Sequence, residues 1–404
     1  MNDGLAPGGA LILGGYANAL GVARELAAVG IPVVAIYWEP FAIVQHSRAV
    51  QAGHCLADQS DLVGILESLG AAHRGWLLIP TNDHALTALA ENRDRLRAWY
   101  SIGVPEWERT RRLVDKTASN QAAMAAGLAL PRIYGAATAT AVDRQDIRFP
   151  VLVKPDRSHL FQEIFGRKLF VATDRTALQD ATRRTAAAGI TAQLVEYVPG
   201  PGRRVVCVVT FVGTDGEPSE PICYRKLRHA PPRFGVASVA ELVACRDLVE
   251  PTRALLSELR WRGPAALEFK LDARDGSYRF LEINGRSVLP NQLLRQAGYP
   301  FARAQWCQSL GQAWHPEPNG WRGRWIHLHA DLATRLLGSR RSSPTWREFW
   351  HPYSGPKVFA VWSPSDPGPF LAQWRRSLID SLRLPFRPEQ RHELRRRVEL
   401  PPGL

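Results

Sequence analysis

Cysteine is scarce in this sequence, and long apolar runs are missing. The five cysteines are scattered between Cys55 and Cys307 without a Cys-x-x-Cys pair, which argues against a disulfide framework and against a zinc site. No stretch approaches about 18 uncharged apolar residues, the length that a membrane-spanning helix needs. No segment has the basic, apolar and small-residue order of a signal peptide. We therefore expect a cytoplasmic protein with free thiols.

Acidic residues are outnumbered by basic ones. The 404 residues include 51 Lys and Arg against 38 Asp and Glu, which gives a net charge of +13. Such a charge could attract an anionic substrate such as ATP, a nucleic acid or an anionic membrane surface, or could reflect a genome that favours arginine codons. No nucleic-acid-binding motif accompanies the charge. We therefore expect no nucleic-acid partner, whereas peripheral membrane contact stays open.

The chain is long enough for two or three domains, at about 100–200 residues per domain, and its 45% of apolar residues is typical of globular proteins. Residues 1–112 alternate between strand and helix patterns. This alternation predicts a Rossmann-like α/β domain with a parallel sheet. We expect strands at 10–13, 32–37 and 76–79, and helices at 18–29 and 83–99.

The first expected strand ends in the loop Gly14-Gly15-Tyr16-Ala17-Asn18. Open α/β sheets bind ligands at the carboxyl ends of their strands, and the N-terminus of the following helix can hold an anionic group. The loop lacks a Gly-x-Gly-x-x-Gly pattern, so a dinucleotide site is poorly supported. We expect Gly15 and Asn18, together with Asp83, to help bind a carboxylate substrate.

From residue 113 the pattern changes to α+β with antiparallel hairpins. Residues 113–200 should form a small subdomain that begins with a connector containing one helix, at 118–126. Residues 201–325 should form a larger subdomain with a metal site. Residues 326–404 are expected to be an extension that packs on the core and contains a helix near 370–384. Whether this extension makes a homodimer stays open.

A hairpin carries the clearest chemical pattern. We expect its strands at Ala266–Leu271 and Tyr278–Asn284. Period-two alternation puts Glu268 on the polar face of the first strand. On the second strand, Glu282 and Asn284 should share a face, opposite Leu281 and Ile283. Two carboxylates and an amide oxygen suit Mg²⁺, with Mn²⁺ as an alternative. A solvated edge hairpin is the competing explanation, but it accounts less well for the strict alternation.

Two lysines and an acid lie at the ends of expected elements. Lys154 ends the strand 150–154, and Lys116 precedes the connector helix. A lysine in such a place is usually solvated, but it can also present a cation to phosphate. Glu196 lies on a strand that runs into Pro199-Gly200, a turn that could act as a hinge and contact an adenine edge. Arg286 follows the hairpin and could fork onto a phosphate.

The order of these motifs resembles the ATP-grasp superfamily. The motifs are Asp115-Lys116, Phe149-Pro150 with Lys154-Pro155, Val195-Glu196-Tyr197 with Pro199-Gly200, Glu268, and Leu281-Glu282-Ile283-Asn284 with Arg286. The whole chain also resembles the predicted ATP-dependent carboligases, which are carboxylate–amine ligases related to D-aspartate ligase. That narrower likeness rests on residues 14–21, 80–83, 224–228 and 235–238.

The resemblance implies an N-terminal Rossmann-like pre-ATP-grasp domain of α/β type, followed by α+β ATP-grasp domains. It also implies a ligase that joins a carboxylate to an amine through an acyl phosphate and releases ADP and phosphate. The implied ligands are Lys116 and Lys154 for the nucleotide phosphates, Glu196, Tyr197 and Val198 for adenine, Glu268, Glu282 and Asn284 for Mg²⁺, and Lys226, Arg228 and Arg286 for the transferring phosphoryl group.

The sequence departs from the superfamily pattern at two places. Arg203 stands where an acid often binds ribose. The lid segment 156–168, which is often glycine-rich, has a single glycine, so Arg157, Arg167 or Lys168 would cap the phosphates. Two other functions also stay open, namely a nucleotide-binding protein without turnover and a basic protein that binds nucleic acid or membranes. The complete set of expected metal ligands favours the enzyme.

Overall fold

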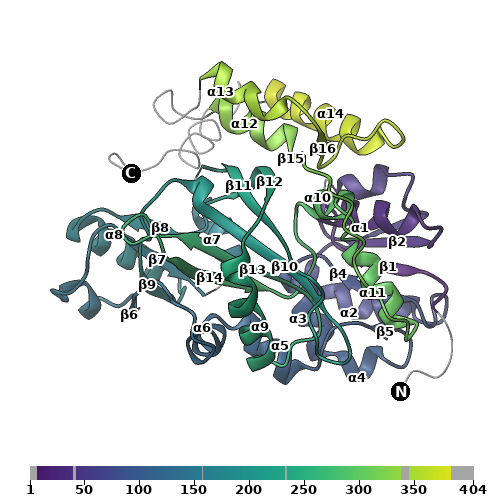
Figure 1. Cartoon of the computed structure of the whole chain (residues 1–404), viewed down its shortest axis with the longest axis horizontal. Helices are drawn as coiled ribbons and strands as arrows, with labels where there is room; N and C mark the ends of the chain where they lie inside the picture. The colour runs from purple at the N-terminus through teal and green to yellow at the C-terminus, as the bar shows by residue number, and fades with distance from the viewer. Residues whose placement is uncertain (1–6, 40–41, 157, 233, 338–344, 384–404) are drawn as a thin grey trace.

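Three β-sheets form the framework of the protein (Figure 1). The computed structural model describes residues 7–39, 42–156, 158–232, 234–337 and 345–383. The N-terminal residues form a five-stranded sheet, and the segment after the connector forms a four-stranded sheet. A seven-stranded sheet lies between these two in Figure 1, and the C-terminal helices form a layer above it.

The five-stranded sheet is parallel throughout, as the alternation of strands and helices predicted, with the order β3-β2-β1-β4-β5. Its strands are β1 (Ala10–Leu13), β2 (Val33–Tyr37), β3 (Ala52–Cys55), β4 (Leu77–Pro80) and β5 (Ser101–Ile102). Its helices are α1 (Ala17–Ala27), α2 (Leu62–Leu69), α3 (Asp83–Glu91) and α4 (Arg93–Leu96). The single helix expected at 83–99 is wrong, because Asn92 leaves the helical conformation and its side chain caps the Ala88 carbonyl at 3.0 Å.

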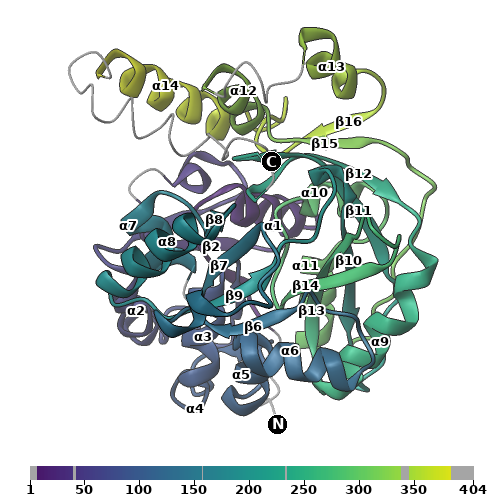
Figure 2. The same ribbon diagram turned by 90° about the vertical axis from the view of Figure 1, so that its left-hand side faces the viewer.

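The four-stranded sheet is antiparallel, has the order β6-β9-β7-β8, and faces the viewer in Figure 2. Its strands are β6 (Ile133–Ala136), β7 (Val151–Pro155), β8 (Phe170–Ala172) and β9 (Ala192–Glu196). Two helices pack on it, α7 (Ser158–Phe165) and α8 (Arg175–Ala187). The lid segment 156–168 therefore contains a helix over most of its length.

Two helices lead into this sheet, and the second of them corresponds to the helix expected at 118–126. They are α5 (Trp107–Val114) and α6 (Lys116–Ala125). Asp115 separates them because its backbone is extended and its carboxylate accepts hydrogen bonds from the backbone N–H groups of Thr117 and Ala118, at 2.8 and 2.9 Å. Helix α5 crosses residue 112, where we expected the first domain to end.

The seven-stranded sheet has the order β14-β13-β10-β11-β12-β15-β16 and is antiparallel except between β15 and β16. Its strands are β10 (Val205–Val212), β11 (Ile222–Ala230), β12 (Val236–Val243), β13 (Gly263–Leu271), β14 (Tyr278–Asn284), β15 (Arg324–Ile326) and β16 (Lys357–Phe359). Leu267 and Phe269 of β13 pack into one core with α9 (Val249–Glu258), whereas Ala266 packs into another. Helices α10 (Asn291–Gln296) and α11 (Phe301–Ser309) contribute to that second core.

The C-terminal segment extends this sheet and returns to the N-terminal domain. Its helices are α12 (Leu328–Leu337), α13 (Trp346–Trp350) and α14 (Gly368–Arg383). Asp366 accepts hydrogen bonds from the Arg24 guanidinium and the Ser47 hydroxyl at 2.9 and 2.6 Å. Residues 384–404 of the expected extension lie outside the described part of the chain. No helix in the described part combines the length and apolar character needed to cross a membrane.

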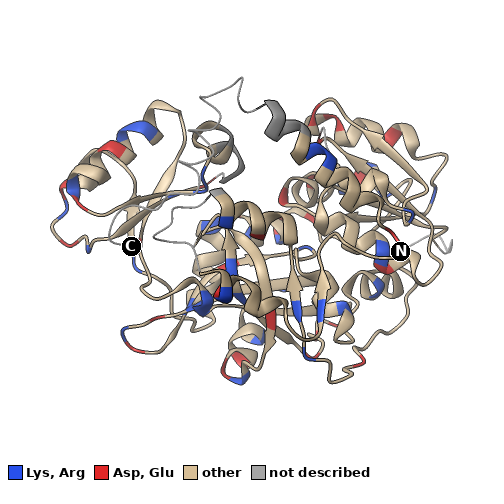
Figure 3. Cartoon of the chain, turned by 90° about the horizontal axis from the view of Figure 1, so that it is seen from above, with Lys and Arg blue, Asp and Glu red and all other residues tan. Residues whose placement is uncertain are grey.

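Charged residues are distributed over the whole described chain. Figure 3 shows basic residues on helices and strands in each part of the molecule, interspersed with acidic ones. Many of them are paired in exposed ion pairs within one helix, such as Arg183 with Asp180 and Arg111 with Glu108. The net charge of +13 is therefore spread over several elements.

Candidate functional site

A cavity of about 270 Å³ lies between the four-stranded and seven-stranded sheets. On the small sheet, period-two alternation points Leu152 and Lys154 of β7 into the cavity, together with Gln193 and Val195 of β9. The intervening residues, such as Val153, pack into the core of the small domain instead. Alternation along two adjacent strands therefore builds this wall of the cavity.

The seven-stranded sheet supplies the opposite wall from five of its strands, β10 to β14. Tyr224 and Lys226 come from β11, and Glu268 and Lys270 come from β13. Ten of the site residues expected from the sequence line this one cavity, although they are spread over about 170 residues of chain. They are Lys116, Lys154, Glu196, Tyr197, Val198, Lys226, Glu268, Glu282, Asn284 and Arg286.

The β13–β14 hairpin departs from the expected alternation at Leu281. Glu268 pairs with Glu282, but Phe269 pairs with Phe280, so Leu281 is an extra residue in β14. Such a bulge redirects the side chains around it. Ile283 joins the core and is not among the residues that line the cavity, whereas Leu281 lines it, so the expectation that Leu281 and Ile283 share a face is wrong. The Leu281 carbonyl accepts a hydrogen bond from Lys154 Nζ at 3.2 Å.

Two carboxylates lie opposite each other at the centre of the hairpin. Lys226 Nζ donates to Glu268 Oε2 at 2.6 Å, and both of these side chains are largely buried. Burial alone would raise the pKa of Glu282, but the positive charges of four surrounding lysines, of which Lys154 has the largest effect, together outweigh it and lower that pKa to about 2. The Glu282 side chain remains accessible from the cavity. It is an ionised carboxylate surrounded by ammonium groups.

Lys116 and Lys154 are neighbours at one side of the cavity. Lys116 Nζ donates to the Pro155 carbonyl, at the end of the strand that carries Lys154. Burial and the charge of Lys154 lower the pKa of Lys116 to about 8, and the attraction of Glu282 only partly opposes this. A group with negative charge would relieve the repulsion between the two lysines.

The hinge acid Glu196 is held by an arginine of the large sheet. Arg274, in the turn between β13 and β14, donates to Glu196 and also binds Asp272 at 2.5 Å. Burial raises the pKa of Glu196, but the hydrogen bond and charge of Arg274 together with the hydrogen bond from the Arg132 backbone N–H outweigh it, so the pKa is lowered. This ion pair links the two sheets at the expected hinge. The adjacent Tyr197 ring lies 4.8 Å from Lys270 Nζ.

Apolar side chains line another part of the cavity. They are Leu130, Ile133, Leu152, Leu169, Val195, Val198 and Phe280. Flat aromatic ligands suit such walls, because pockets for small molecules combine apolar surfaces with a few polar groups. The cavity therefore offers both apolar walls and a cluster of cations.

Two of the three expected substrate residues, Asp83 and Asn18, lie at the junction between the N-terminal domain and the large sheet. Asp83 binds Arg286 through both carboxylate oxygens, at 2.7 and 3.0 Å. Asn18 donates to the carbonyls of Thr81 and Ser287 at 2.7 and 2.8 Å. Gly15 lies close to Ala42 and Glu39, since a Cβ there would fall 2.4 Å from the Ala42 Cβ. Asp83 and Asn18 thus hold the segment that carries Arg286.

Arg228 is directed to the C-terminal layer and is not among the residues that line the cavity. Its guanidinium binds Asp331 at 2.7 Å and stacks over the Phe349 ring at 4.8 Å. A bulge after Lys226 in β11 breaks the alternation that would have placed Arg228 on the same face as Lys226. Arg228 therefore does not join Lys226 and Arg286 in the cavity, as the expected contact with a phosphoryl group would require.

The lid segment contributes one of its three expected cations to the cavity. Lys168 lines it, whereas Arg167 lies 5.9 Å from the Phe170 ring, and Arg157 lies outside the described residues. Two further residues line the cavity, namely Tyr224, which lies in the segment 224–228 but was given no role from the sequence, and His229, which was not expected. The position of Tyr224, two residues before Lys226 on the same strand, was the available signal.

No protein-family model and no curated protein matches this sequence. Solved structures do match the fold. A biotin carboxylase from Campylobacter jejuni is 17% identical with a TM-score of 0.62, over 78% of this chain and 74% of that one. An L-amino acid ligase from Bacillus licheniformis is 17% identical with a TM-score of 0.59, over 76% and 75%. The biotin carboxylase domain of Hydrogenobacter thermophilus 2-oxoglutarate carboxylase is 17% identical with a TM-score of 0.60, over 78% and 73%.

The chain has the ATP-grasp fold. In this ATP-grasp fold, the residues of the cavity are suited to a nucleotide with a divalent cation. Glu268, Glu282 and Asn284 offer the oxygen ligands that Mg²⁺ prefers. The described residues contain no group of three or more His, Cys, Asp or Glu side chains arranged for a metal, so two carboxylates and an amide would need phosphate oxygens and water to complete the shell.

Proposed function

We propose that this protein is an ATP-dependent carboxylate–amine ligase, which forms an amide or peptide bond through an acyl phosphate and releases ADP and phosphate. One observation carries the proposal. Lys116, Lys154, Lys168 and Lys226 all act electrostatically on the ionised Glu282, which is the arrangement needed to hold a polyphosphate beside a metal-binding carboxylate. The ATP-grasp fold supports the same reading.

The proposed reaction has two steps. A carboxylate oxygen of the acid attacks the γ-phosphorus of ATP, the bond to the bridging oxygen breaks, and ADP leaves. The amine nitrogen then attacks the acyl carbon, the C–O bond to phosphate breaks, and the nitrogen loses a proton. Neither step needs a nucleophilic side chain. The protein's task is to position the reactants and to neutralise charge.

Individual residues divide this task. Lys116 and Lys154, with Lys168 from the lid segment, would hold the nucleotide phosphates. Lys226 and Arg286 would stabilise charge on the transferring phosphoryl group, and both keep a charged form because a carboxylate partner outweighs the effect of burial on the pKa.

Adenine would lie among the apolar walls of the cavity, next to Glu196, Tyr197 and Val198. Glu268, Glu282 and Asn284 would hold Mg²⁺, or Mn²⁺, which supplies charge neutralisation at the phosphates when bound. Asp83 would act by orienting Arg286.

Two similar structures guide the choice of substrates to test. One similar structure is a ligase of L-amino acids, and another was solved with MgADP and bicarbonate. We therefore propose amino acids as the first acids and amines to test, with bicarbonate as a further acid.

The test is release of ADP and phosphate by the full chain with Mg²⁺ and pairs of amino acids. We expect release that depends on both an acid and an amine. Glu282→Gln should lower kcat at least about a hundredfold, because a preorganised charge at the reacting group is removed. Glu217→Gln, on an exposed turn away from the cavity, is the matched control and should be unchanged.

Two results would contradict the proposal. If no pair gives turnover and Glu282→Gln binds nucleotide as tightly as the unmodified protein, the chain is a nucleotide-binding protein without ligase activity. Retention on polyanions without ATP hydrolysis would instead favour a basic surface-binding protein.

A further inference from the structure

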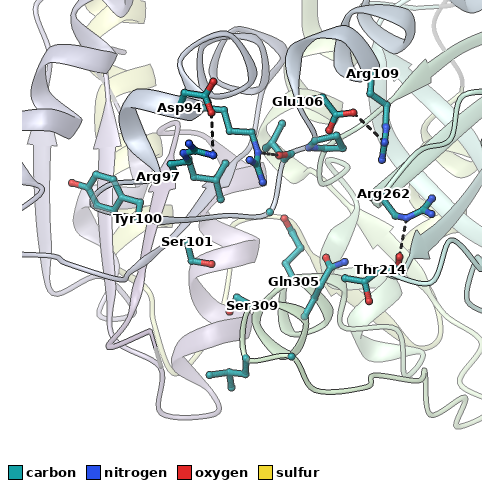
Figure 4. Close-up of a pocket in the computed structure, with 18 of the residues that line it drawn as sticks. Asp94, Arg97, Tyr100, Ser101, Glu106, Arg109, Thr214, Arg262, Gln305 and Ser309 are labelled. Atoms are coloured by element: carbon teal, nitrogen blue, oxygen red, sulfur yellow. Dashed lines mark hydrogen bonds and ion pairs between the residues drawn. The ribbon is translucent and has the colours of Figure 1, made fainter. Parts of the chain in front are cut away.

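A second cavity lies at the opposite end of the large sheet from the hinge, between the N-terminal domain and helix α11 (Figure 4). Its volume is about 1230 Å³. The segment from α4 to α5 forms one wall, and the β10–β11 turn with Arg262 and α11 forms the other. This cavity shares no lining residue with the cavity described above.

The lining carries an excess of positive charge. Four arginines line it, against the two acids Asp94 and Glu106. Arg97 pairs with Asp94 at 3.4 Å, and Arg109 pairs with Glu106 at 3.0 Å. The charges within each of these two ion pairs cancel, so the excess positive charge resides on the other two arginines.

Those two arginines, Arg93 and Arg262, are held by neutral groups. Arg93 Nε donates to the Val104 carbonyl at 3.1 Å, and Arg262 donates to the carbonyls of Thr214 and Trp261 at 3.2 and 2.7 Å. In the part of the chain that the structure describes, neither makes an ion pair. Both arginines are half-buried and line the cavity, and their hydrogen bonds to carbonyls leave their positive charges without a carboxylate partner among the described residues.

A buried amide adds an independent observation. Gln305 of α11 is only 4% exposed and lines the cavity. Its Nε2 has no acceptor among the described residues. Figure 4 shows the side chain between Ser101 and Thr214, in the middle of the cavity. A buried amide N–H without a partner is uncommon in folded proteins, and the group that would satisfy it is an oxygen acceptor.

We propose that this second cavity binds a small oligoanion, a molecule with at least two phosphate or carboxylate groups, through Arg93, Arg262 and Gln305. The two guanidiniums suit separate oxyanions, and the Gln305 amide donates to a further oxygen. Arg262 directly precedes β13, the strand that carries Glu268. A ligand here would bridge the N-terminal domain and this strand, so the site is suited to an effector of the catalytic cavity.

The test measures binding of pyrophosphate and of citrate to the full chain by isothermal titration calorimetry, with chelator present. Because the catalytic cavity also attracts anions, the measurement is made in a Lys154→Met, Lys226→Met background. We expect one binding event to persist there. Arg93→Ala and Gln305→Leu should each weaken it at least tenfold. Arg95→Ala should not, because Arg95 lies in the same short helix but pairs with Glu67 outside the cavity.

The two probes separate the two chemistries, since tighter pyrophosphate binding identifies a phosphate ligand and tighter citrate binding a carboxylate ligand. The proposal is overturned if neither probe binds in that background at millimolar concentration. It is also overturned if Arg93→Ala and Gln305→Leu bind as Arg95→Ala does. Circular dichroism of each variant checks that weaker binding does not result from loss of the fold. Arg93→Ala removes only a half-buried side chain, so it tests the site even if Gln305→Leu fails to fold.

Discussion

Lys116 illustrates how the site is tuned at the scale of single residues. Its ammonium is buried next to the charge of Lys154, and both effects lower its pKa to about 8. The repulsion between these two cations is already present in the folded protein before any ligand binds. A bound polyphosphate would reduce that repulsion, so the site favours polyanions over monoanions.

The pH dependence of nucleotide binding follows from this shift. Below pH 8 Lys116 is charged, and above pH 8 it loses its proton. Binding that needs the charged form must then take up a proton, which weakens affinity by up to about tenfold per pH unit. Calorimetry of ADP binding between pH 7 and 9.5 should show this decline. In Lys116→Met, binding should be weaker at pH 7 and nearly flat over this range. An equally steep decline in the variant would contradict the assignment.

We expect Asp83 to position Arg286. It binds Arg286 through two hydrogen bonds but does not line the cavity. Asp83→Asn should therefore lower kcat by about tenfold with little change in the KM for ATP, since the orientation of one transition-state group is relaxed. Asp83→Glu should recover part of the rate. Glu91→Gln, on the exposed end of the same helix, is the control. If Asp83→Asn raised KM and left kcat unchanged, Asp83 would contact substrate instead.

At the scale of elements, the start of α6 sets the place of Lys116. Asp115 caps this helix through two backbone N–H groups. Asp115→Ala should lower the free energy of unfolding by about 1 kcal/mol, the usual effect of removing such a cap. Asp115→Ser should keep most of the stability, because serine also caps. Urea denaturation measures both variants, and equal stability of Asp115→Ala and the unmodified protein would show that the cap is not needed.

The elements also show what the sequence could and could not predict. Buried strands such as β1 and β2 are continuous apolar runs, and the paired acids of the hairpin were visible from alternation. β3 could not be found in this way, because Ala52–Cys55 has no apolar pattern and its place is set by pairing with β2. The bulges at Leu281 and after Lys226 break alternation through tertiary pairing, so the faces of Leu281 and Arg228 were beyond sequence reasoning.

At the scale of the whole molecule, the C-terminal layer is attached to the N-terminal domain through Asp366. Arg24 and Asp366 are 12% and 8% exposed, and Asp366 also accepts from Ser47 and from the backbone of Arg48. This contact joins residues more than 300 positions apart. Because α12 and α13 are in turn held by Arg228 through Asp331 and Phe349, the C-terminal layer connects β11 with the N-terminal domain.

Breaking this attachment should be costly. Asp366→Ala leaves Arg24 buried without its partner, and we expect a loss of about 3–5 kcal/mol in unfolding free energy. Tryptophan fluorescence during urea denaturation reports on the layer, which is rich in tryptophan. Glu250→Ala, which removes an exposed ion pair with Arg253, should cost less than about 1 kcal/mol. Similar effects of the two substitutions would show that the attachment contributes little.

The central claim is that phosphoryl transfer to a carboxylate precedes amide formation. The most direct measurement uses an acid labelled with ¹⁸O in its carboxylate, from a pair of amino acids that supports turnover, and mass spectrometry of the phosphate released. Transfer through an acyl phosphate predicts that one labelled oxygen appears in phosphate for each ADP formed. Phosphate without label, or release of AMP and pyrophosphate instead of ADP, would contradict the account.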